Sequence, residues 1–292
     1  MIFQRRDALR GGAALALGTA ASRLTARPSR RGRPLGLADI TVSRDLARDY
    51  RGTLRKVAGL GYTHFGFRLA GYGPGTKELP ASEKARLVRE AGLAVGVVRL
   101  GVIGVDYEAQ IAEAATIGAS IVALTTAPVF VSGRALGVTT RAAFDAWLPK
   151  FARLGARCRE AGLTLAYHNH PWDLEPLEGD RPLDLMASLI PPRDLAFEVD
   201  LAWCWYAGVA PLDLLKQLRG RISSLHLKDI DRTRGQRRDE QAVVIGGGEM
   251  GYAALLPRVV KLTDAVGYIE VDQPANGLIA AADGARFYRK YV

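Results

Sequence analysis

Short apolar runs that alternate with amphipathic segments of helical length constrain the fold of this chain more than any other feature. A buried run followed by a helical pattern is typical of a β-strand and α-helix unit, and repeated units of this kind build a parallel sheet. The helical segments include 43–60, 82–91 and 140–161. Eight strands are expected, near residues 35–42, 62–68, 94–100, 119–125, 163–170, 194–200, 221–228 and 266–272.

Eight such units in one chain predict a closed barrel. They cover about 260 residues, close to the size of a (β/α)8 TIM barrel. The chain has 292 residues and is 48% hydrophobic, which suffices for one large core. The alternative, an open doubly wound sheet, is disfavoured because no glycine-rich dinucleotide loop follows the first strand. We therefore predict an α/β fold, a single-domain TIM barrel over residues 35–292.

The amino terminus is a different kind of sequence. In MIFQRRDALRGGAALALGTAAS an arginine pair, Arg5 and Arg6, precedes a short apolar run and small residues. The run is too short to span a bilayer, so the pattern predicts an export signal of the twin-arginine (Tat) type, which carries folded proteins. A disordered basic terminus is the alternative. We predict an export signal over 1–26, cleaved after Ala21 or Ala26, a basic linker over 27–34, and a periplasmic or otherwise exported protein that meets the Tat machinery.

The charge of the chain excludes little by itself. The formal net charge is +10, and removal of residues 1–26 lowers it to about +7. Because the arginines are mostly scattered and the protein is expected to be exported, a nucleic-acid partner is not expected. The charge instead favours an anionic or polar small ligand. Cys158 and Cys204 are too few for a disulfide scaffold, and whether they pair is left open.

Polar residues gather at the predicted ends of the last four strands. Side chains alternate across a strand, so Leu165 and Tyr167 are expected to face the helices, and His168 and His170 the barrel interior. The same alternation directs Glu198 and Asp200, then Ser224, His226 and Lys228, then Tyr268, Glu270 and Asp272 inward. Active sites of TIM barrels lie at this carboxyl-terminal rim.

Four of these residues form a candidate metal site. His168, Asp200, His226 and Glu270 supply the nitrogen and oxygen ligands that suit manganese, zinc, cobalt or iron, with positions left for substrate. The alternatives are that a histidine is a satisfied structural residue or that an acid pairs with Lys228. So many buried ionisable groups are costly unless an ion or a partner compensates them, which favours the metal.

In combination, the segments YHNH, VDLAW, RISSLHLKD, GGGE and YIEVDQP resemble the sugar phosphate isomerase/epimerase family, which has the xylose isomerase-like TIM barrel. The resemblance covers about residues 35–292. It implies a divalent ion held by an acidic residue on the fifth strand and by Asp200, His226 and Glu270 on the next three. His168 stands where many members have Glu, as in a YHNH branch that includes exported proteins and relatives acting on 3-keto-glycosides.

Two further positions depart from the family pattern. Gly66 in the second strand stands where the family usually has Glu, and Arg99 ends the third strand where a small residue or histidine is common.

Trp172, Trp203 and Trp205 lie near strand ends, where they would either stack on a sugar or pack in the core. Arg232, Arg234, Arg237 and Arg238 follow the seventh strand, as a solvated loop or a grip on an acid group.

The chemistry that the resemblance implies is proton abstraction beside a carbonyl, by a divalent-metal-dependent sugar isomerase or epimerase. Glu270 is the expected carboxylate base, and His170 a second acid/base because its ordinary pKa lies near neutrality. Lys228 is expected either to neutralise an oxyanion or to pair with Glu198. Whether His168 or His170 touches the metal is open.

Other functions remain as alternatives. A metal-dependent 3-keto-glycoside lyase or hydrolase would use the same enolate chemistry, and a non-catalytic carbohydrate-binding barrel would use none. A three-metal DNA repair endonuclease needs more ligands than four histidines in this distribution supply. In each hypothesis that involves a carbohydrate, the partner is a small carbohydrate. Because sugar phosphates are cytoplasmic, export favours an unphosphorylated one.

Overall fold

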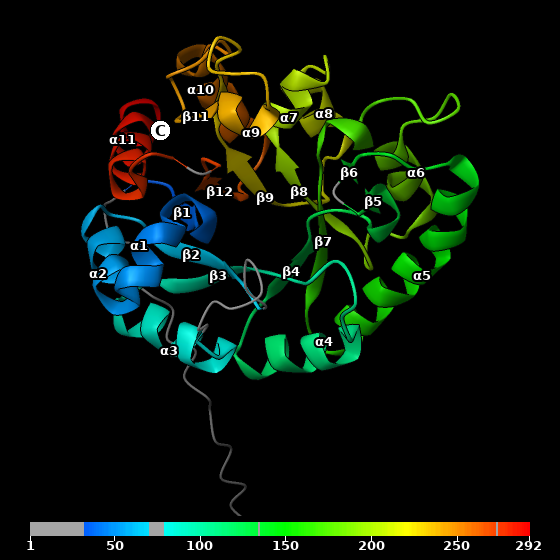
Figure 1. Cartoon of the computed structure of the whole chain (residues 1–292), viewed down its shortest axis with the longest axis horizontal. Coiled ribbons are helices and arrows are strands. Elements are labelled where there is room, and N and C mark those ends of the chain that lie inside the picture. Colours follow the sequence, from blue (N-terminus) through cyan, green and yellow to red (C-terminus); the bar gives the residue numbers. More distant parts are fainter. Residues whose placement is uncertain (1–31, 70–78, 134, 273) are drawn as a thin grey trace, which may run out of the picture. The chain divides into compact units, whose positions relative to one another are not determined.

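The computed structural model describes residues 32–69, 79–133, 135–272 and 274–292. These residues form a closed barrel of eight parallel strands surrounded by helices (Figure 1). The strands are β1 (Leu35–Ala38), β2 (His64–Arg68), β3 (Ala94–Arg99), β4 (Ile121–Leu124), β7 (Thr164–His168), β8 (Ala196–Asp200), β9 (Ile222–Leu227) and β12 (Val266–Ile269). The predicted TIM barrel is confirmed. The predicted export signal and most of the basic linker lie outside the described residues.

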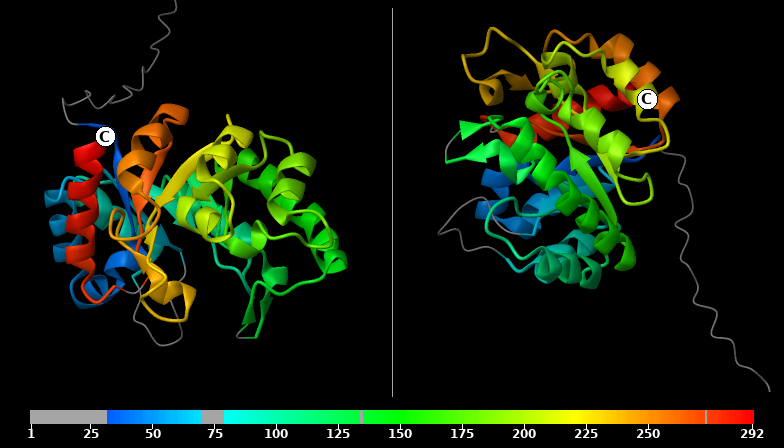
Figure 2. Two further views of the ribbon diagram at one scale, coloured as in Figure 1. Left: turned by 90° about the horizontal axis from the view of Figure 1, so that it is seen from above. Right: turned by 90° about the vertical axis from the view of Figure 1, so that its right-hand side faces the viewer.

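Helices follow the strands around the outside of the barrel. They are α1 (Ser43–Arg48), α2 (Tyr50–Gly59), α3 (Ala81–Glu90), α4 (Tyr107–Thr116), α5 (Arg141–Glu160), α6 (Pro182–Leu189), α7 (Leu201–Tyr206), α8 (Pro211–Gln217), α9 (Arg238–Gln241), α10 (Tyr252–Leu262) and α11 (Gly277–Tyr291). The last helix, α11, packs against both α2 and α10, so the ring of helices closes (Figure 2). No helix in the described part of the chain is long and apolar enough to cross a bilayer.

The remaining elements lie in the connections between strands and helices. In the described residues these include three short 3-10 helices, η1 (Asp39–Val42), η2 (Pro128–Phe130) and η3 (Pro171–Asp173). Two small hairpins, which the sequence pattern did not predict, are β5 (Val131–Ser132) with β6 (Ala135–Leu136) and β10 (Asp229–Ile230) with β11 (Ala242–Val243).

The helix expected over 43–60 is divided in two. Asp49 has an extended backbone, with φ of −153°, and its side chain accepts a hydrogen bond from Gly52 N, so it ends α1 and caps α2. An Asp that caps the following turn competes with the continuing helix, and periodicity alone does not show this. In contrast, the segment expected over 140–161 is the single helix α5, capped by Thr140.

The core has two layers. The outer layer lies between strands and helices, where Tyr167 of β7 packs its ring against Trp147 and Phe151 of α5 as the alternation predicted. The inner layer fills the barrel with Val97, Ala123, Ala166 and Tyr268. A side chain at Gly36 would collide with the Tyr268 ring, so the glycine makes room for that ring.

The two cysteines do not form a disulfide. Cys158 and Cys204 are both free and buried. Burial raises the pKa of each thiol to about 12, so neither is a reactive thiolate at neutral pH.

Candidate metal and active site

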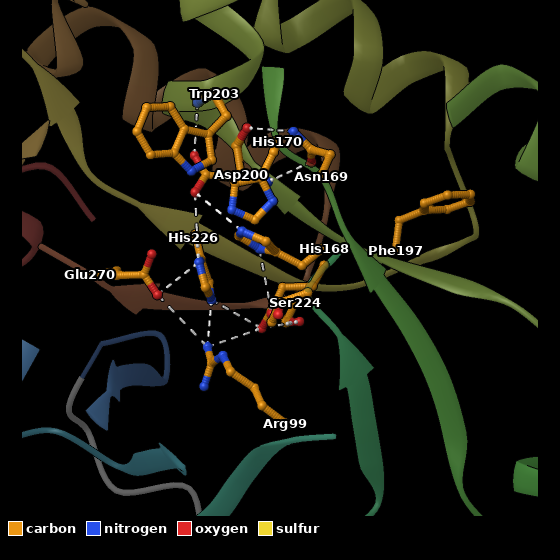
Figure 3. A network of polar contacts seen from close by, with 12 residues as sticks. Arg99, His168, Asn169, His170, Phe197, Asp200, Trp203, Ser224, His226 and Glu270 are labelled. Carbon is orange, nitrogen blue, oxygen red and sulfur yellow. Dashed lines mark hydrogen bonds and ion pairs between the residues drawn. The ribbon is translucent and has the colours of Figure 1, made fainter. Parts of the chain in front are cut away.

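A pocket of about 220 Å³ opens at the carboxyl-terminal rim of the barrel. Its lining comprises Ile40, Arg68, Arg99, Thr125, Thr126, Leu136, His168, His170, Trp203, His226, Lys228, Glu270 and Asp272. Asp200 is fully buried beside it. The polar residues predicted at the ends of the last four strands are therefore brought together, as Figure 3 shows for the central ones.

Three residues offer ligand atoms close enough for one ion. One atom each from His168, Asp200 and His226 lies within 4.8 Å of the others, and all three side chains are buried. Asp200 Oδ2 lies 3.9 Å from His168 Nε2 and 3.7 Å from His226 Nδ1. Glu270 is outside this group of three, but its Oε2 lies 3.1 Å from His226 Nδ1. Of the two histidines at the end of β7, His168 is the one in this group of three, and its role as a metal ligand stays a prediction.

The junction between β8 and α7 orients Asp200. Its Oδ1 accepts hydrogen bonds from Ala202 N and Trp203 N, both at 2.9 Å, and so caps α7. The other oxygen, Oδ2, is left to face the two histidines. In the segment VDLAW, Asp200 therefore ends β8, caps α7 and is a candidate metal ligand.

Asn169 holds β7 and β8 together beyond the last pair of their ladder, which is His168 with Glu198. Its side-chain oxygen accepts from Asp200 N at 2.9 Å, and its amide nitrogen donates to Asp200 O at 3.3 Å. The amide thus takes the place of a backbone pair. It fixes the distance between His168 and Asp200, a role that the sequence analysis missed.

Lys228 lies among carboxylates at the pocket. Its Nζ is 2.5 Å from Glu270 Oε1, 3.0 Å from Asp200 Oδ2 and 3.3 Å from Asp272 Oδ2. The expected pairing with Glu198 is wrong, because that residue faces Arg99 and the histidines instead. Burial lowers the pKa of Lys228, but the attraction of Asp200 and Asp272 outweighs it, so the amine stays protonated.

Arg99 and Gly66 are one feature rather than two separate departures. A side chain at position 66 would lie 3.1 Å from Arg99 Nη1 and 3.0 Å from Val97 O. The guanidinium therefore lies directly against β2 at position 66, where the family resemblance implies Glu. Arg99 is 3% exposed and lies 2.6 Å from His226 Nε2 and 3.7 Å from Glu198 Oε1.

The charges and the unpaired atoms of this cluster fit a divalent cation. Four carboxylates, Glu198, Asp200, Glu270 and Asp272, form ion pairs with two permanent cations, Arg99 and Lys228, and Arg68 also lines the pocket. Burial lowers the pKa of His226, but Glu198 and Glu270 raise it well above its ordinary value, a sign that the site attracts positive charge. Asp200 Oδ2 and His226 Nδ1 are buried without a hydrogen bond, although Lys228 Nζ lies 3.0 Å from that oxygen and Glu270 Oε2 lies 3.1 Å from that nitrogen. A divalent ion would give both atoms a further partner.

His170 lies beside the cluster. Its ring stacks on Trp172 at 4.5 Å and meets the His168 ring edge-on at 4.8 Å. Burial and the nearby Lys228 lower the pKa of His170 to about 3, so at neutral pH the ring is neutral and only weakly basic. Its role as a second acid/base stays a prediction.

Of the three tryptophans near strand ends, Trp203 lines the pocket, and Lys228 Nζ lies 4.5 Å from the centre of its ring. Trp205 stacks under Arg232 instead. Two other arginines of that loop also meet groups outside the pocket lining: Arg237 pairs with Asp239, and Arg238 lies over the Trp172 ring. This arrangement agrees with a solvated loop.

The segments HLKD and GGGE form one unit. Asp229 is fully buried, and its carboxylate accepts from Gly246 N at 3.1 Å and from Met250 N at 3.0 Å. Glu249 in turn accepts from Arg232 N. The glycine-rich loop is therefore fastened to the end of β9 directly after Lys228.

Comparison with known proteins gives the family. A family model described as xylose isomerase-like TIM barrel matches residues 54–291. No significant match was found among curated proteins. Solved structures also share the fold. A sugar phosphate isomerase/epimerase from Parabacteroides distasonis has a TM-score of 0.74 at 17% identity and covers 90% of this chain and 95% of that one.

Two other solved structures are more distant. An L-ribulose 3-epimerase has a TM-score of 0.63 at 14% identity, covering 88% of this chain and 93% of its own. A xylose isomerase-like TIM barrel protein from Mycobacterium smegmatis, in complex with magnesium, has a TM-score of 0.61 at 16% identity, covering 89% and 96%. Since the family match spans most of the chain and every strand end that carries the cluster, this protein belongs to the xylose isomerase-like TIM barrel family.

Proposed function

We propose that this protein is a divalent-metal-dependent enzyme that isomerises or epimerises a carbohydrate by moving a proton on a carbon next to a carbonyl. The observation that carries the proposal is the convergence of His168, Asp200 and His226 on one point beside an open pocket, with Glu270 in contact. The similarity to proteins named sugar phosphate isomerase/epimerase and L-ribulose 3-epimerase supports it, as does the relative that binds magnesium.

His168, Asp200, His226 and Glu270 would hold the ion. When bound, a divalent cation supplies Lewis-acid stabilisation of the negative charge that develops on the carbonyl oxygen. Lys228 adds a fixed positive charge at the same rim, because its amine is held protonated by the carboxylates around it. The Trp203 ring forms an apolar wall of the pocket, suited to one face of a sugar.

Two groups are candidates for the proton transfer. Glu270 is 6% exposed; burial raises its pKa, but His226 and Lys228 lower it well below the ordinary value, so it is ionised and can accept a proton. His170 is the second candidate because its ring lines the pocket, although its pKa of about 3 makes it a weak base in the protein without substrate. A pair of acceptors at one rim suits exchange at adjacent carbons or on both faces of one carbon.

Metal analysis combined with solvent deuterium exchange tests this proposal. Wild-type protein is expected to bind about one divalent ion per chain and to introduce deuterium beside the carbonyl of a sugar in a panel of keto-sugars and 3-keto-glycosides. His226→Gln should lose both properties. His64→Gln is the matched control, because His64 begins β2, outside the pocket lining. Expulsion of a glycosidic group would indicate a lyase instead, and absence of both metal and exchange in the wild type would contradict the proposal.

We also propose export by the twin-arginine route, on the evidence of Arg5 and Arg6 ahead of a short apolar run. A reporter fused after residue 34 should reach the periplasm of a Tat-competent bacterium, and replacement of both arginines by lysine should retain it in the cytoplasm. Unchanged export of the lysine variant would contradict the proposal.

A further inference from the structure

Glu198 is a buried carboxylate that the proposed mechanism does not use. Its side chain is fully buried on the inner face of β8, two residues before Asp200. A carboxylate in such a place is costly unless its oxygens meet donors. Its Oε1 accepts from Ser224 Oγ at 3.1 Å and lies 3.7 Å from Arg99 Nη2. These contacts use one oxygen and leave Oε2 to be explained.

Each oxygen of Glu198 faces a different histidine. Oε1 lies 3.3 Å from His226 Nε2, and Oε2 lies 3.6 Å from His168 Nδ1. The opposite nitrogens of the same two rings, His226 Nδ1 and His168 Nε2, face Asp200 Oδ2. The two rings are thus held between one carboxylate on the outer side and the candidate metal site on the inner side. Figure 3 shows both rings next to Asp200.

A neutral imidazole has one N–H group and one nitrogen with a free lone pair, and only the latter can bind a metal. A carboxylate next to the outer nitrogen keeps the hydrogen there and leaves the lone pair on the inner nitrogen. We propose that Glu198 is a positioning residue that sets the tautomers of both histidines, with the hydrogen on Nδ1 of His168 and on Nε2 of His226. This inference rests on the metal dependence proposed above.

Arg99 makes the carboxylate necessary at His226. Its Nη2 lies 2.6 Å from His226 Nε2, and an arginine can only donate. Arg99 therefore favours a lone pair on Nε2 and the hydrogen on Nδ1, the tautomer that cannot bind metal through Nδ1. Glu198 Oε1 competes for the same nitrogen as an acceptor. The same oxygen lies 3.7 Å from Arg99 Nη2, so Glu198 also offers the guanidinium an acceptor other than the ring nitrogen.

The affinity for Zn²⁺, measured by competition with a chelator, is the first test. Glu198→Gln keeps the size of the side chain but has a single acceptor oxygen, so it can serve one ring and opposes the other with its NH2 group. We expect it to bind Zn²⁺ about 10- to 100-fold more weakly than the wild type. Ser224→Ala is the matched control, because it removes a hydrogen bond from the same carboxylate without touching a ring, and its affinity should stay near that of the wild type.

Ring nitrogen spectra provide a readout that a purely structural role would not change. The chain has four histidines, so the ¹⁵N ring signals of the Zn²⁺-loaded protein can be assigned with His64→Gln and His170→Gln. The wild type should show the hydrogen on Nδ1 of His168 and on Nε2 of His226, and Glu198→Gln should alter at least one ring. Should that variant not fold, a wild-type spectrum with either hydrogen on the other nitrogen still refutes the inference.

Three results would overturn the inference. The first is a wild-type spectrum with either hydrogen on the other nitrogen. The second is a Glu198→Gln protein with wild-type affinity and wild-type tautomers, whatever its folding stability, since that would leave Glu198 only a structural role. The third is a wild type that binds no Zn²⁺ and no other divalent ion, which refutes the metal dependence as well. The first two leave the proposed function intact.

Discussion

Asn169→Ala should uncouple the ends of β7 and β8. The substitution removes the hydrogen bond that Asp200 N donates at 2.9 Å and the weaker one that Asp200 O accepts at 3.3 Å. Asn169 is 1% exposed, so water cannot easily replace its amide. A buried N–H left without an acceptor costs about 1–3 kcal/mol, and the second bond adds about 0.5–1.5 kcal/mol. We therefore expect a loss of about 2–4 kcal/mol in the free energy of unfolding.

The same substitution should weaken metal binding, because it frees the ligand on β8 from its neighbour on β7. Outer-shell partners of metal ligands typically contribute 10- to 100-fold in affinity, so at least about a tenfold weaker affinity for Zn²⁺ is expected. Urea unfolding of the metal-free protein gives the first quantity, and chelator competition gives the second. The two measurements are independent, since one is made without the ion.

Asn276→Ala is the matched control for this experiment. Asn276 is exposed and caps α11 by accepting from Ile279 N at 3.0 Å. Its removal should cost about 1 kcal/mol and leave the affinity for Zn²⁺ unchanged. If Asn169→Ala costs no more than Asn276→Ala and binds Zn²⁺ equally well, the side chain does not fix the two strand ends, and the reasoning is refuted.

Three further predictions concern buried charge and close packing. Burial raises the pKa of Asp173 to about 7, although hydrogen bonds from His170 N and Tyr167 lower it, so the protonated form of Asp173 favours folding. Relative to Asp173→Asn, the wild type should therefore lose up to about 4 kcal/mol of unfolding free energy as pH rises from about 4 to above 7. Parallel stability curves for the two proteins would contradict this prediction. Lys228→Met should cost the metal-free protein about 3–5 kcal/mol in urea unfolding, because the carboxylates lose their buried positive partner. The variant should nevertheless bind Zn²⁺ more tightly in a chelator assay, because the positive charge that competes with the ion is gone. Weaker binding would refute this argument. Gly248→Ala should cost about 1–3 kcal/mol, since the new methyl group would lie 2.3 Å from Ile230 O. Gly59→Ala is the control and should be nearly neutral, because its methyl group would meet nothing within 4 Å. Equal shifts in the melting temperatures of the two variants would contradict the prediction.

The sequence by itself was sufficient for the architecture and for the end of the barrel at which the polar residues gather. Alternation of apolar runs and helical segments predicted the eight strands, because a parallel barrel buries each strand on both sides and requires a helix between strands. The period of two along each strand then placed His168, Asp200, His226 and Glu270 on one rim, since the carboxyl ends of parallel strands meet there. The boundaries were less accurate, as the division at Asp49 shows, because local capping decides them.

Only the tertiary structure decided how these residues are partnered. The alternation of side chains along each strand directed Glu198 and Lys228 to the same barrel interior. It could not show that Lys228 reaches Glu270 and Asp200 on neighbouring strands, or that Glu198 lies beside the outer nitrogens of two histidines. This alternation fixes only the face of a strand on which a side chain lies. The height at which long side chains from different strands meet depends on strand register and on the filling of the barrel, and both are set by contacts distant in the sequence.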